Sequence, residues 1–276
     1  MPSLSDEHPI ANAPNRNVRR HDTKDGSTTI YSSHFKQYYH NPNGALSESE
    51  IVFFTNTRLN ELIEKKGQDV HIFEMGFGTG LNFLLAAHKM MTAVNRNALH
   101  FYSVEAFPID PETAKGFSYP IQWVKTELNH WIPNILSDVH PGWNTFQPDP
   151  KWPIYLHLYV GFLKELGELS CLDHPIDVYF HDAFSVEQNP ECWTYEVFTC
   201  YRQWGHSKSI LSTYAAATQV RAAMAAANWS VYKTPGALGK REMTLACSTQ
   251  SNNLFEDAKP CPNERLKQRW FRGEWS

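Results

Sequence analysis

Three glycines at alternate positions, Gly76, Gly78 and Gly80, follow an apolar run that has Glu74 at its end. A helical pattern begins directly after them, so they lie at a strand-to-helix turn where the backbone can approach a ligand closely. Such a turn suits the phosphates of a nucleoside triphosphate, a dinucleotide or a small charged molecule. The alternative without a ligand is a plain turn that needs glycines only for close packing.

The residues around the turn distinguish between these possible ligands. A Walker-type phosphate loop needs Lys-Ser or Lys-Thr after its last glycine, and Leu81-Asn82 stands there. The dinucleotide fingerprint Gly-x-Gly-x-x-Gly has a different spacing. Glu105, which ends the next apolar run, is placed to bind ribose hydroxyls. The loop resembles that of class I S-adenosylmethionine-dependent methyltransferases, which predicts a set of cofactor-binding residues: Glu74, Gly76, Phe77, Gly78, Thr79, Gly80, Asn82, Glu105 and Asp182.

Asp182 and Phe184 form a second informative cluster, just past the carboxyl end of a buried strand, where open α/β sheets place their ligands. Asp182 is predicted to act as a base or orienting acceptor, with a solvated loop carboxylate as the alternative. Phe184 is predicted to stack on a substrate ring. Residues 189–191, Asn-Pro-Glu, favour a helix start, with Asn as N-cap and Pro at the first helical position.

The middle of the chain alternates apolar runs with helical patterns, which predicts an α/β fold with a mostly parallel, doubly wound sheet. Strands are expected at 69–75, 99–107, 154–161, 177–184 and 209–215, and helices at 80–93, 122–137, 162–170, 192–204 and 216–228. Residues 229–233 and 243–248 suggest a terminal antiparallel pair. Residues 138–153, rich in Pro and Trp, are expected to be an irregular insertion.

The predicted organisation has three parts. Residues 1–68 form an N-terminal arm and a small β/α extension, in which 1–20 are extended and 27–40 form a strand or hairpin. Ser47 and Glu50 have the spacing of a capping box before an amphipathic stretch that Gly67 ends. Residues 69–250 form the cofactor-binding domain. Residues 251–276 form a basic tail.

Composition excludes several classes of protein. The net charge of −4 does not indicate that the protein as a whole binds nucleic acid, so any RNA-binding surface must be a local one. The five cysteines are odd in number and contain no Cys-x-x-Cys pair, which argues against a disulfide scaffold or a zinc site. The first 20 residues lack the apolar core of a signal peptide, and no apolar run approaches the ~20 residues of a membrane helix. We expect a cytoplasmic protein without metal or membrane association.

Several motifs together resemble the methyltransferase domain of the bifunctional bacterial tRNA-modifying MnmC family and its stand-alone relatives. The similarity runs from about residue 28 to about 249, and the matching segments keep their order and spacing: 76–84 (GFGTGLNFL), 104–108 (VEAFP), 181–194 (HDAFSVEQNPECWT), 211–229 and 239–243 (GKREM). This combination is far more specific than the glycine loop alone. It implies a class I methyltransferase fold that binds S-adenosyl-L-methionine.

The resemblance also implies a substrate, the exocyclic amine of 5-aminomethyl-2-thiouridine at the wobble position of tRNA. Asp182 would then be the base or orienting acceptor for the amine, and Phe184 would stack on the pyrimidine. Tyr31 would close the pocket unless it is only a packed hairpin residue. The flavin-dependent half of the family needs another full domain, so we expect no oxidase activity here; a separate oxidase would then be a partner.

Some features leave alternatives open. Gly161-Phe162 stands where the family pattern has Gly-Asp, so adenine recognition is expected to use backbone groups or another side chain. A second interpretation has an amine of a small molecule or a protein as the acceptor, and a third is a non-catalytic S-adenosylmethionine-binding protein. The basic residues of 259–272, Lys240-Arg241 and Arg16, Arg19 and Arg20 are candidates for RNA contact, although the tail is equally well explained as a solvated helix.

Overall fold

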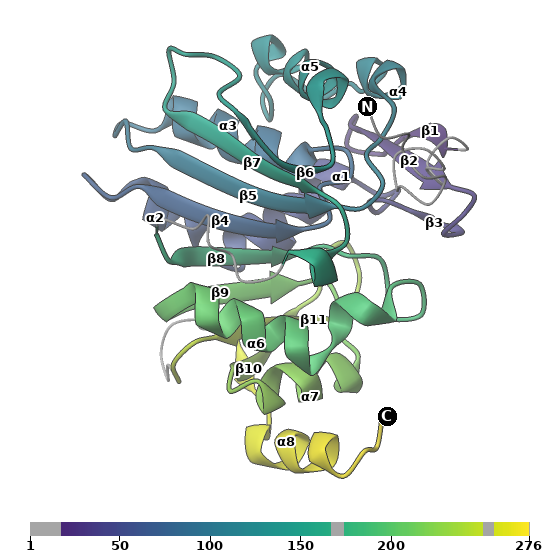
Figure 1. Ribbon diagram of the computed structural model, residues 1–276, viewed down its shortest axis with the longest axis vertical. Coiled ribbons are helices and arrows are strands. Elements are labelled where there is room, and N and C mark those ends of the chain that lie inside the picture. The colour runs from purple at the N-terminus through teal and green to yellow at the C-terminus, as the bar shows by residue number, and fades with distance from the viewer. Residues whose placement is uncertain (1–17, 167–173, 251–256, 276) are drawn as a thin grey trace, which may run out of the picture.

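The computed structural model describes residues 18–166, 174–250 and 257–275, and its centre is a nine-stranded sheet (Figure 1). Across the sheet the strands follow in the order β12 (Lys259–Pro260), β10 (Ser230–Pro235), β11 (Glu242–Cys247), β9 (Gly205–Thr213), β8 (Ile176–His181), β4 (Val70–Met75), β5 (Leu99–Glu105), β7 (Ile154–Val160) and β6 (Gly142–Phe146). The neighbours from β9 to β7 are parallel, and the outer strands pair antiparallel. The predicted doubly wound sheet with an antiparallel C-terminal strand is confirmed.

Each face of the sheet buries its own apolar core because successive side chains of a strand point to opposite faces. In β4, Ile72 belongs to one core and Phe73 to the other. The first core is covered by α3 (Leu81–Thr92) and α5 (Trp131–Asp138), and the second by α6 (Tyr195–Trp204), α7 (Thr218–Ala226) and α8 (Asn263–Phe271). Figure 1 shows α6 and α7 in front of the sheet and α3 behind it.

The remaining helical segments are short. They are α1 (Ala45–Ser49), the π-helix η2 (Glu50–Thr55), α2 (Leu59–Ile63), α4 (Pro111–Lys115) and the 3₁₀ turns η3 (Thr126–Leu128), η4 (Leu163–Glu165) and η5 (Pro190–Trp193). None of the helices in the described ranges combines the length and the apolar character that crossing a membrane requires.

The order of the strands creates a crevice at the carboxyl ends of β4 and β8. From β4 the chain proceeds to β5 and β7 on one side, and then returns to β8 and β9 on the other. The loops after β4 and β8 therefore leave in opposite directions, which is where doubly wound sheets bind ligands. The two loops start side by side, since the Asp182 amide donates to the Met75 carbonyl oxygen at 3.0 Å.

A second, antiparallel sheet stands beside this crevice. It contains β1 (Val18–Asp22), β2 (Thr28–Ser32) and β3 (Gln37–Tyr38), so the hairpin expected within 27–40 is confirmed. Residues 18–20, expected in an extended arm, instead pair as part of β1; residues 1–17 lie outside the described part of the chain. Ile30, fully buried, ties this small sheet to the first core.

Two other local expectations were wrong. The segment 138–153 is not an irregular insertion throughout, because β6 forms the edge strand next to β7. Ser47 and Glu50 do not form a capping box: Gly44 is the N-cap of α1, the Ser47 hydroxyl donates to Asp25 Oδ2 at 2.9 Å, and Glu50 pairs with Lys89.

The expected helices differ in extent. The amphipathic stretch before Gly67 is divided into η2 and α2, with Arg58 between them in the left-handed region at φ 57°. Of the helix expected over 162–170, the described residues show only the 3₁₀ turn η4, and residues 167–170 lie outside the described ranges.

Ser212 fastens the N-terminal helices to the main sheet. Its buried hydroxyl in β9 donates to the Val52 carbonyl oxygen at 2.6 Å and accepts from Asn56 Nδ2 at 2.7 Å. Both partners belong to the segment around η2, and this segment leads from the small sheet to β4. The hydroxyl therefore helps to hold the N-terminal extension against the domain that it covers.

Replacing Ser212 by Ala should lower the free energy of unfolding by about 1–3 kcal/mol, because it leaves the buried Asn56 amide and Val52 carbonyl unsatisfied. Chemical denaturation followed by fluorescence measures the change. Ser207→Ala, at an exposed position of the same strand, is the matched control and should stay within about 0.5 kcal/mol of the wild type. Equal effects of the two substitutions would contradict this role of Ser212.

Candidate active site

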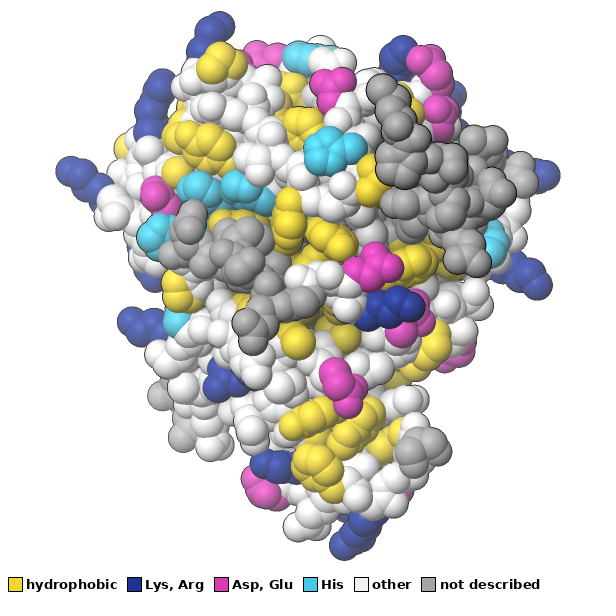
Figure 2. Space-filling model, viewed as in Figure 1, with side chains coloured by type: hydrophobic (Ala, Val, Ile, Leu, Met, Phe, Trp, Pro, Cys, Tyr) yellow, Lys and Arg dark blue, Asp and Glu magenta, His cyan; other side chains and the backbone are white. Residues whose placement is uncertain are grey.

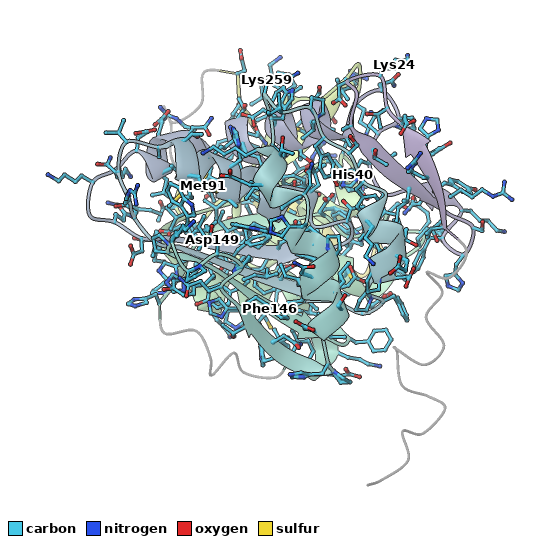
Figure 3. The ribbon with its side chains drawn as sticks, turned by 90° about the horizontal axis from the view of Figure 1, so that it is seen from above. Lys24, His40, Met91, Phe146, Asp149 and Lys259 are labelled. Carbon is cyan, nitrogen blue, oxygen red and sulfur yellow. The ribbon has the colours of Figure 1, made fainter. Side chains whose placement is uncertain are left out.

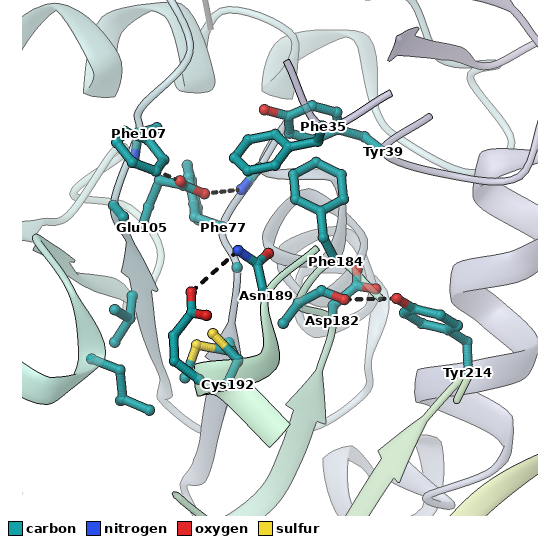
Figure 4. A pocket seen from close by; sticks show the side chains of 18 of the residues that line it. Phe35, Tyr39, Phe77, Glu105, Phe107, Asp182, Phe184, Asn189, Cys192 and Tyr214 are labelled. Atoms are coloured by element: carbon teal, nitrogen blue, oxygen red, sulfur yellow. Dashed lines mark hydrogen bonds between the residues drawn. The ribbon is translucent and has the colours of Figure 1, made fainter. Parts of the chain in front are cut away.

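A cavity of about 1030 Å³ lies at the carboxyl ends of β4, β5 and β8. Its wall combines the glycine loop after β4 with residues of the small N-terminal sheet, the segment after β8 and the loop between β10 and β11. Figure 4 shows side chains from the glycine loop, the N-terminal segment and the segment after β8 directed into the same space. The site is thus assembled from parts of the chain that are far apart in the sequence.

The glycine loop needs its glycines for shape and for space. Gly76, Gly78 and Gly80 have φ values of 91°, 52° and 72°, which side-chain-bearing residues rarely adopt. A Cβ at Gly76 would lie 3.0 Å from the Asp182 carbonyl oxygen, and one at Gly78 would lie 3.1 Å from the Tyr39 ring. The loop can therefore pass between the β8 segment and the N-terminal sheet only without side chains.

Other residues of the loop divide between the cavity and the core. Phe77 is buried and lines the cavity, as do Gly76 and Gly78. Thr79 and Gly80 are not among the lining residues; Thr79 is fully buried, and a Cβ at Gly80 would meet Phe77 and Ile132. These two residues therefore support the conformation of the turn on the side away from the cavity.

Glu105 braces the glycine loop from the end of β5. Its Oε2 accepts the Gly78 amide at 2.9 Å, and its Oε1 accepts the Phe107 amide at 2.8 Å. Burial raises the pKa of this carboxyl, while the backbone donors act in the opposite direction. Because Glu105 lines the cavity and each carboxylate oxygen has a further lone pair, it can still accept from hydroxyls such as those of a ribose.

Asn82, in the first turn of α3, bridges two carboxyl groups. Its Nδ2 donates to Glu74 Oε1 at 2.9 Å and to Asp182 Oδ2 at 3.2 Å. Its Oδ1 is buried without a hydrogen-bond partner in the described part of the chain. The other Glu74 oxygen accepts from the Ser103 hydroxyl at 2.9 Å. Asn82 thus links the strand before the glycine loop with the loop after β8.

Glu74 and Asp182 have different surroundings. Glu74 is 1% exposed, does not line the cavity, and has a pKa raised to about 8, mainly by burial. Asp182 lines the cavity, and burial, followed by the nearby charges of Glu74 and Glu48, raises its pKa well above the ordinary value. Glu74 would therefore act on a bound ligand only through Asn82, whereas Asp182 would touch it directly.

Aromatic rings form the wall of the cavity beside Asp182. The Phe184 ring lies 4.4 Å from that of Phe35 and 5.0 Å from that of Tyr39, measured between centroids. Trp193 Nε1 donates to the Phe184 carbonyl oxygen at 2.8 Å and so holds its backbone. Figure 4 shows Phe35, Tyr39 and Phe184 gathered beside Asp182. A flat ring bound here would have its edge near a carboxyl group.

Two sequence candidates are placed differently from expectation. Tyr31 does not line the cavity; its ring packs 5.0 Å from that of Tyr38, which does. Asn189 precedes η5 with Pro190 at the first position, as expected, but its side chain makes no cap: it donates to Glu191 Oε1 at 3.3 Å. Asn189 and Glu191 both line the cavity, and Thr194 supplies the cap of α6.

Sequence reasoning missed Glu48, Lys240 and Tyr214 as cavity residues. Glu48 Oε1 lies 2.8 Å from Lys240 Nζ, and Glu48 Oε2 accepts the Asn41 amide at 2.8 Å. Lys240 lies over the Tyr214 ring at 5.0 Å, and the Tyr214 hydroxyl donates to the Ala183 carbonyl oxygen at 2.8 Å. The only sequence signal for them was that two of the three occur in the segments that carry the family resemblance.

The cavity fits S-adenosyl-L-methionine. The glycine loop offers a cradle without Cβ atoms for the methionine part. Glu105 suits the ribose. Phe107 and Phe162, whose rings lie 5.6 Å apart edge to face, give an apolar end to the cavity beyond Glu105. Adenine would meet rings and backbone there, as expected from Phe162 in place of an acid.

Comparisons with known proteins agree with this geometry. Residues 127–249 match the family model described as S-adenosyl-L-methionine-dependent methyltransferase. The chain is 32% identical over 219 residues to the tRNA 5-methylaminomethyl-2-thiouridine biosynthesis bifunctional protein MnmC of Methylobacillus flagellatus. The aligned region covers 77% of this chain and 33% of that protein. The homologous protein of Campylobacter hominis is 30% identical over 234 residues, covering 83% and 32%. The chain spans about a third of the length of the curated relatives it matches.

Solved structures show the same fold. MnmC2 from Aquifex aeolicus superimposes with a TM-score of 0.69 at 22% identity, over 92% of this chain and 76% of that one. Spermidine synthase in complex with the transition-state analogue AdoDATO superimposes with a TM-score of 0.50 at 9% identity, over 85% and 69%.

Glu74→Gln should reduce the pH dependence of stability. Because the folded-state pKa of Glu74 is about 8, against an ordinary value of 4.5, the folded protein retains a proton that the unfolded chain releases between these values. This contribution to stability is complete below pH 4.5 and falls by up to about 1.4 kcal/mol per pH unit until pH 8. Gln can accept from Asn82 Nδ2 and donate to the Ser103 hydroxyl oxygen, so the variant should keep both contacts and lose this slope.

Urea denaturation between pH 5 and pH 9 measures the effect. Glu61→Gln, an exposed carboxyl on α2, is the control and should leave the slope as in the wild type. A Glu74→Gln protein with the wild-type slope would show that Glu74 is ionised at neutral pH in the folded state.

Proposed function

We propose, because this chain belongs to the family of S-adenosyl-L-methionine-dependent methyltransferases, that it methylates the exocyclic amine of 5-aminomethyl-2-thiouridine at the wobble position of tRNA. The observation that carries the proposal is the placing of Asp182 and Phe184 at one end of a cavity whose other end suits the cofactor. The similarity to bifunctional MnmC proteins supports the choice of acceptor.

The cofactor supplies an electrophilic methyl group, which an amine with a free lone pair can take in an in-line displacement. Two tasks are left to the protein: to align the amine with that methyl group and to remove the proton that an alkylamine carries at neutral pH. Alignment by a rigid wall contributes several kcal/mol to lowering the barrier. The Phe35, Tyr39 and Phe184 rings form such a wall for a pyrimidine, since aromatic side chains stack on extruded RNA bases.

Asp182 is suited to take the proton of the amine. Its raised pKa reduces the difference in acidity between the carboxyl group and an alkylammonium, so that proton transfer is less unfavourable. Asn82 donates to Asp182 Oδ2 and thereby orients the carboxyl group. The neighbouring Glu48 raises the pKa of Asp182 and Lys240 lowers it, so this ion pair tunes the basicity of the site.

A different amine acceptor is the second candidate. The carboxyl groups of Asp182 and Glu48 suit any primary alkylamine, so the charge of the site does not distinguish a nucleoside from a small molecule or a protein lysine. The aromatic wall favours an acceptor with a flat ring. The two candidates are separated by the substrate that receives the methyl group.

Methyl transfer should therefore depend on the modified base. Incubation with labelled S-adenosylmethionine should methylate tRNA that carries 5-aminomethyl-2-thiouridine, and mass spectrometry of the nucleosides should show 5-methylaminomethyl-2-thiouridine. The control is the same tRNA transcribed without modification, which should take up no label. Equal labelling of both RNAs, or labelling of neither together with methylation of a small amine, would contradict the proposed acceptor.

Asp182→Asn should abolish most of the activity and preserve cofactor binding. The amide can still accept from Asn82 but cannot take a proton, so kcat should fall by about 10²- to 10⁴-fold. The dissociation constant of S-adenosylmethionine, measured by calorimetry, should change by less than about threefold. The matched control is Glu187→Gln, an exposed carboxyl on the same segment, which should retain kcat. Full activity of Asp182→Asn would remove Asp182 from the proposed mechanism.

A further inference from the structure

The small N-terminal sheet carries a row of side chains on one face. In the strand register, Arg19 of β1 pairs with Tyr31 of β2, which pairs with Tyr38 of β3. Paired residues of neighbouring strands lie on the same face, and His21, two positions after Arg19, shares that face. We call Arg19, His21, Tyr31 and Tyr38 the β1–β3 platform.

The rings of the platform form one aromatic cluster at the surface. The Tyr38 ring lies 5.0 Å from that of Tyr31 and 5.1 Å from that of His21. Tyr38 is 38% exposed, and Arg19 and His21 are exposed as well. The opposite face of the sheet carries Ile30, which is fully buried in the first core. One face therefore anchors the sheet and leaves the platform facing solvent.

The platform is continuous with the cavity. Tyr38 belongs to the platform and also lines the cavity, and its neighbour Tyr39 packs against Phe184 in the aromatic wall. A bound polymer that placed one of its rings in the cavity would thus pass directly over Tyr38. Because Tyr31 is paired with Tyr38 in the strand register, the next ring of the bound polymer would reach Tyr31.

The charge of this segment differs from that of the whole chain. Residues 18–40 contain four Lys or Arg residues and two Asp residues, whereas the chain as a whole has a net charge of −4. One of the two acids, Asp25, is engaged by the hydroxyls of Ser27 and Ser47. Lys24 and Lys36 are exposed, and Figure 3 shows Lys24 pointing outward from this end of the molecule.

We propose that the β1–β3 platform binds the single-stranded RNA nucleotides next to the acceptor base, with Tyr31 and Tyr38 stacking on bases and Arg19 contacting a phosphate. The proposal rests on the proposed function, because it takes the acceptor base to be part of an RNA loop. Stacking on exposed aromatic rings together with basic side chains along the backbone is how proteins hold single-stranded RNA.

The C-terminal helix α8 is the competing RNA surface. It carries the exposed Phe271, and Figure 2 shows apolar side chains gathered at that end of the molecule. However, Arg269 pairs with Glu274, which neutralises its charge, and Lys267 already donates to Asn228 Oδ1. Figure 1 also places α8 at the opposite end of the molecule from β1, β2 and β3.

Binding of a fluorescently labelled anticodon stem-loop that carries 5-aminomethyl-2-thiouridine tests the proposal. Tyr31→Ala should raise its dissociation constant on the order of 5- to 150-fold, the loss expected when one base loses its aromatic stacking partner. Tyr31→Phe keeps the ring and should bind within about threefold of the wild type. Arg19→Gln should reduce the slope of log Kd against log salt concentration by about 0.7, the value for one phosphate contact of a single strand.

Matched substitutions on α8 are the control. Phe271→Ala and the exposed Arg265→Gln should leave the dissociation constant and the salt slope as in the wild type. Calorimetric binding of S-adenosylmethionine to each variant checks that the protein is folded. Wild-type binding by Tyr31→Ala and Arg19→Gln would overturn the proposal, as would weaker binding confined to the α8 variants.

The outcomes also separate this proposal from the proposed function. If the wild type binds the stem-loop through Tyr31 and Arg19 but does not methylate it, the platform is supported and the proposed acceptor is wrong. If the wild type methylates the stem-loop and the platform variants bind it normally, the acceptor is supported and the platform is wrong.

Discussion

The hydrogen bonds of a single amide organise the proposed active site. Asn82 uses both hydrogens of its Nδ2 to hold Glu74, at the end of β4, and Asp182, after β8. β4 and β8 are paired neighbours and the Asp182 amide donates to the Met75 carbonyl oxygen, so the backbone sets the distance between these segments and Asn82 orients their carboxyl groups. The orientation of the carboxyl group proposed to accept the proton therefore depends on the helix that begins at the glycine loop.

The N-terminal extension completes what the sheet begins. Without it, the carboxyl ends of the strands would offer a crevice open to water on one side, because Phe35, Tyr38, Tyr39 and Glu48 all come from this extension. Ser212 connects it to β9, and the glycine loop passes close to Tyr39. A proton transfer between an amine and a carboxyl group gains from such closure, since the pKa of Asp182 is raised mainly by burial.

The fold alone does not decide the reaction. Proteins as different as MnmC2 and spermidine synthase share it, and function resides in the side chains that each protein adds to the common sheet. Here the added side chains are carboxyl groups and aromatic rings at one end of the cavity, with Lys240 held between Glu48 and Tyr214. This combination suits a cationic amine attached to a flat ring better than it suits a flexible polyamine.

The sequence by itself determined the parallel sheet and the strand-to-helix turn, because hydrophobic periodicity and glycine spacing are local properties of the chain. The family resemblance came from several motifs together and not from these patterns. It also identified Asp182, Phe184 and Glu105 as residues at strand ends. Only the tertiary structure showed that Glu74 is buried behind Asn82, that Tyr31 stands one ring away from the cavity, and that Glu48 and Lys240 meet there. Such facts depend on how distant segments pack, and spacing along the chain does not specify which side chains line the cavity and which are buried away from it.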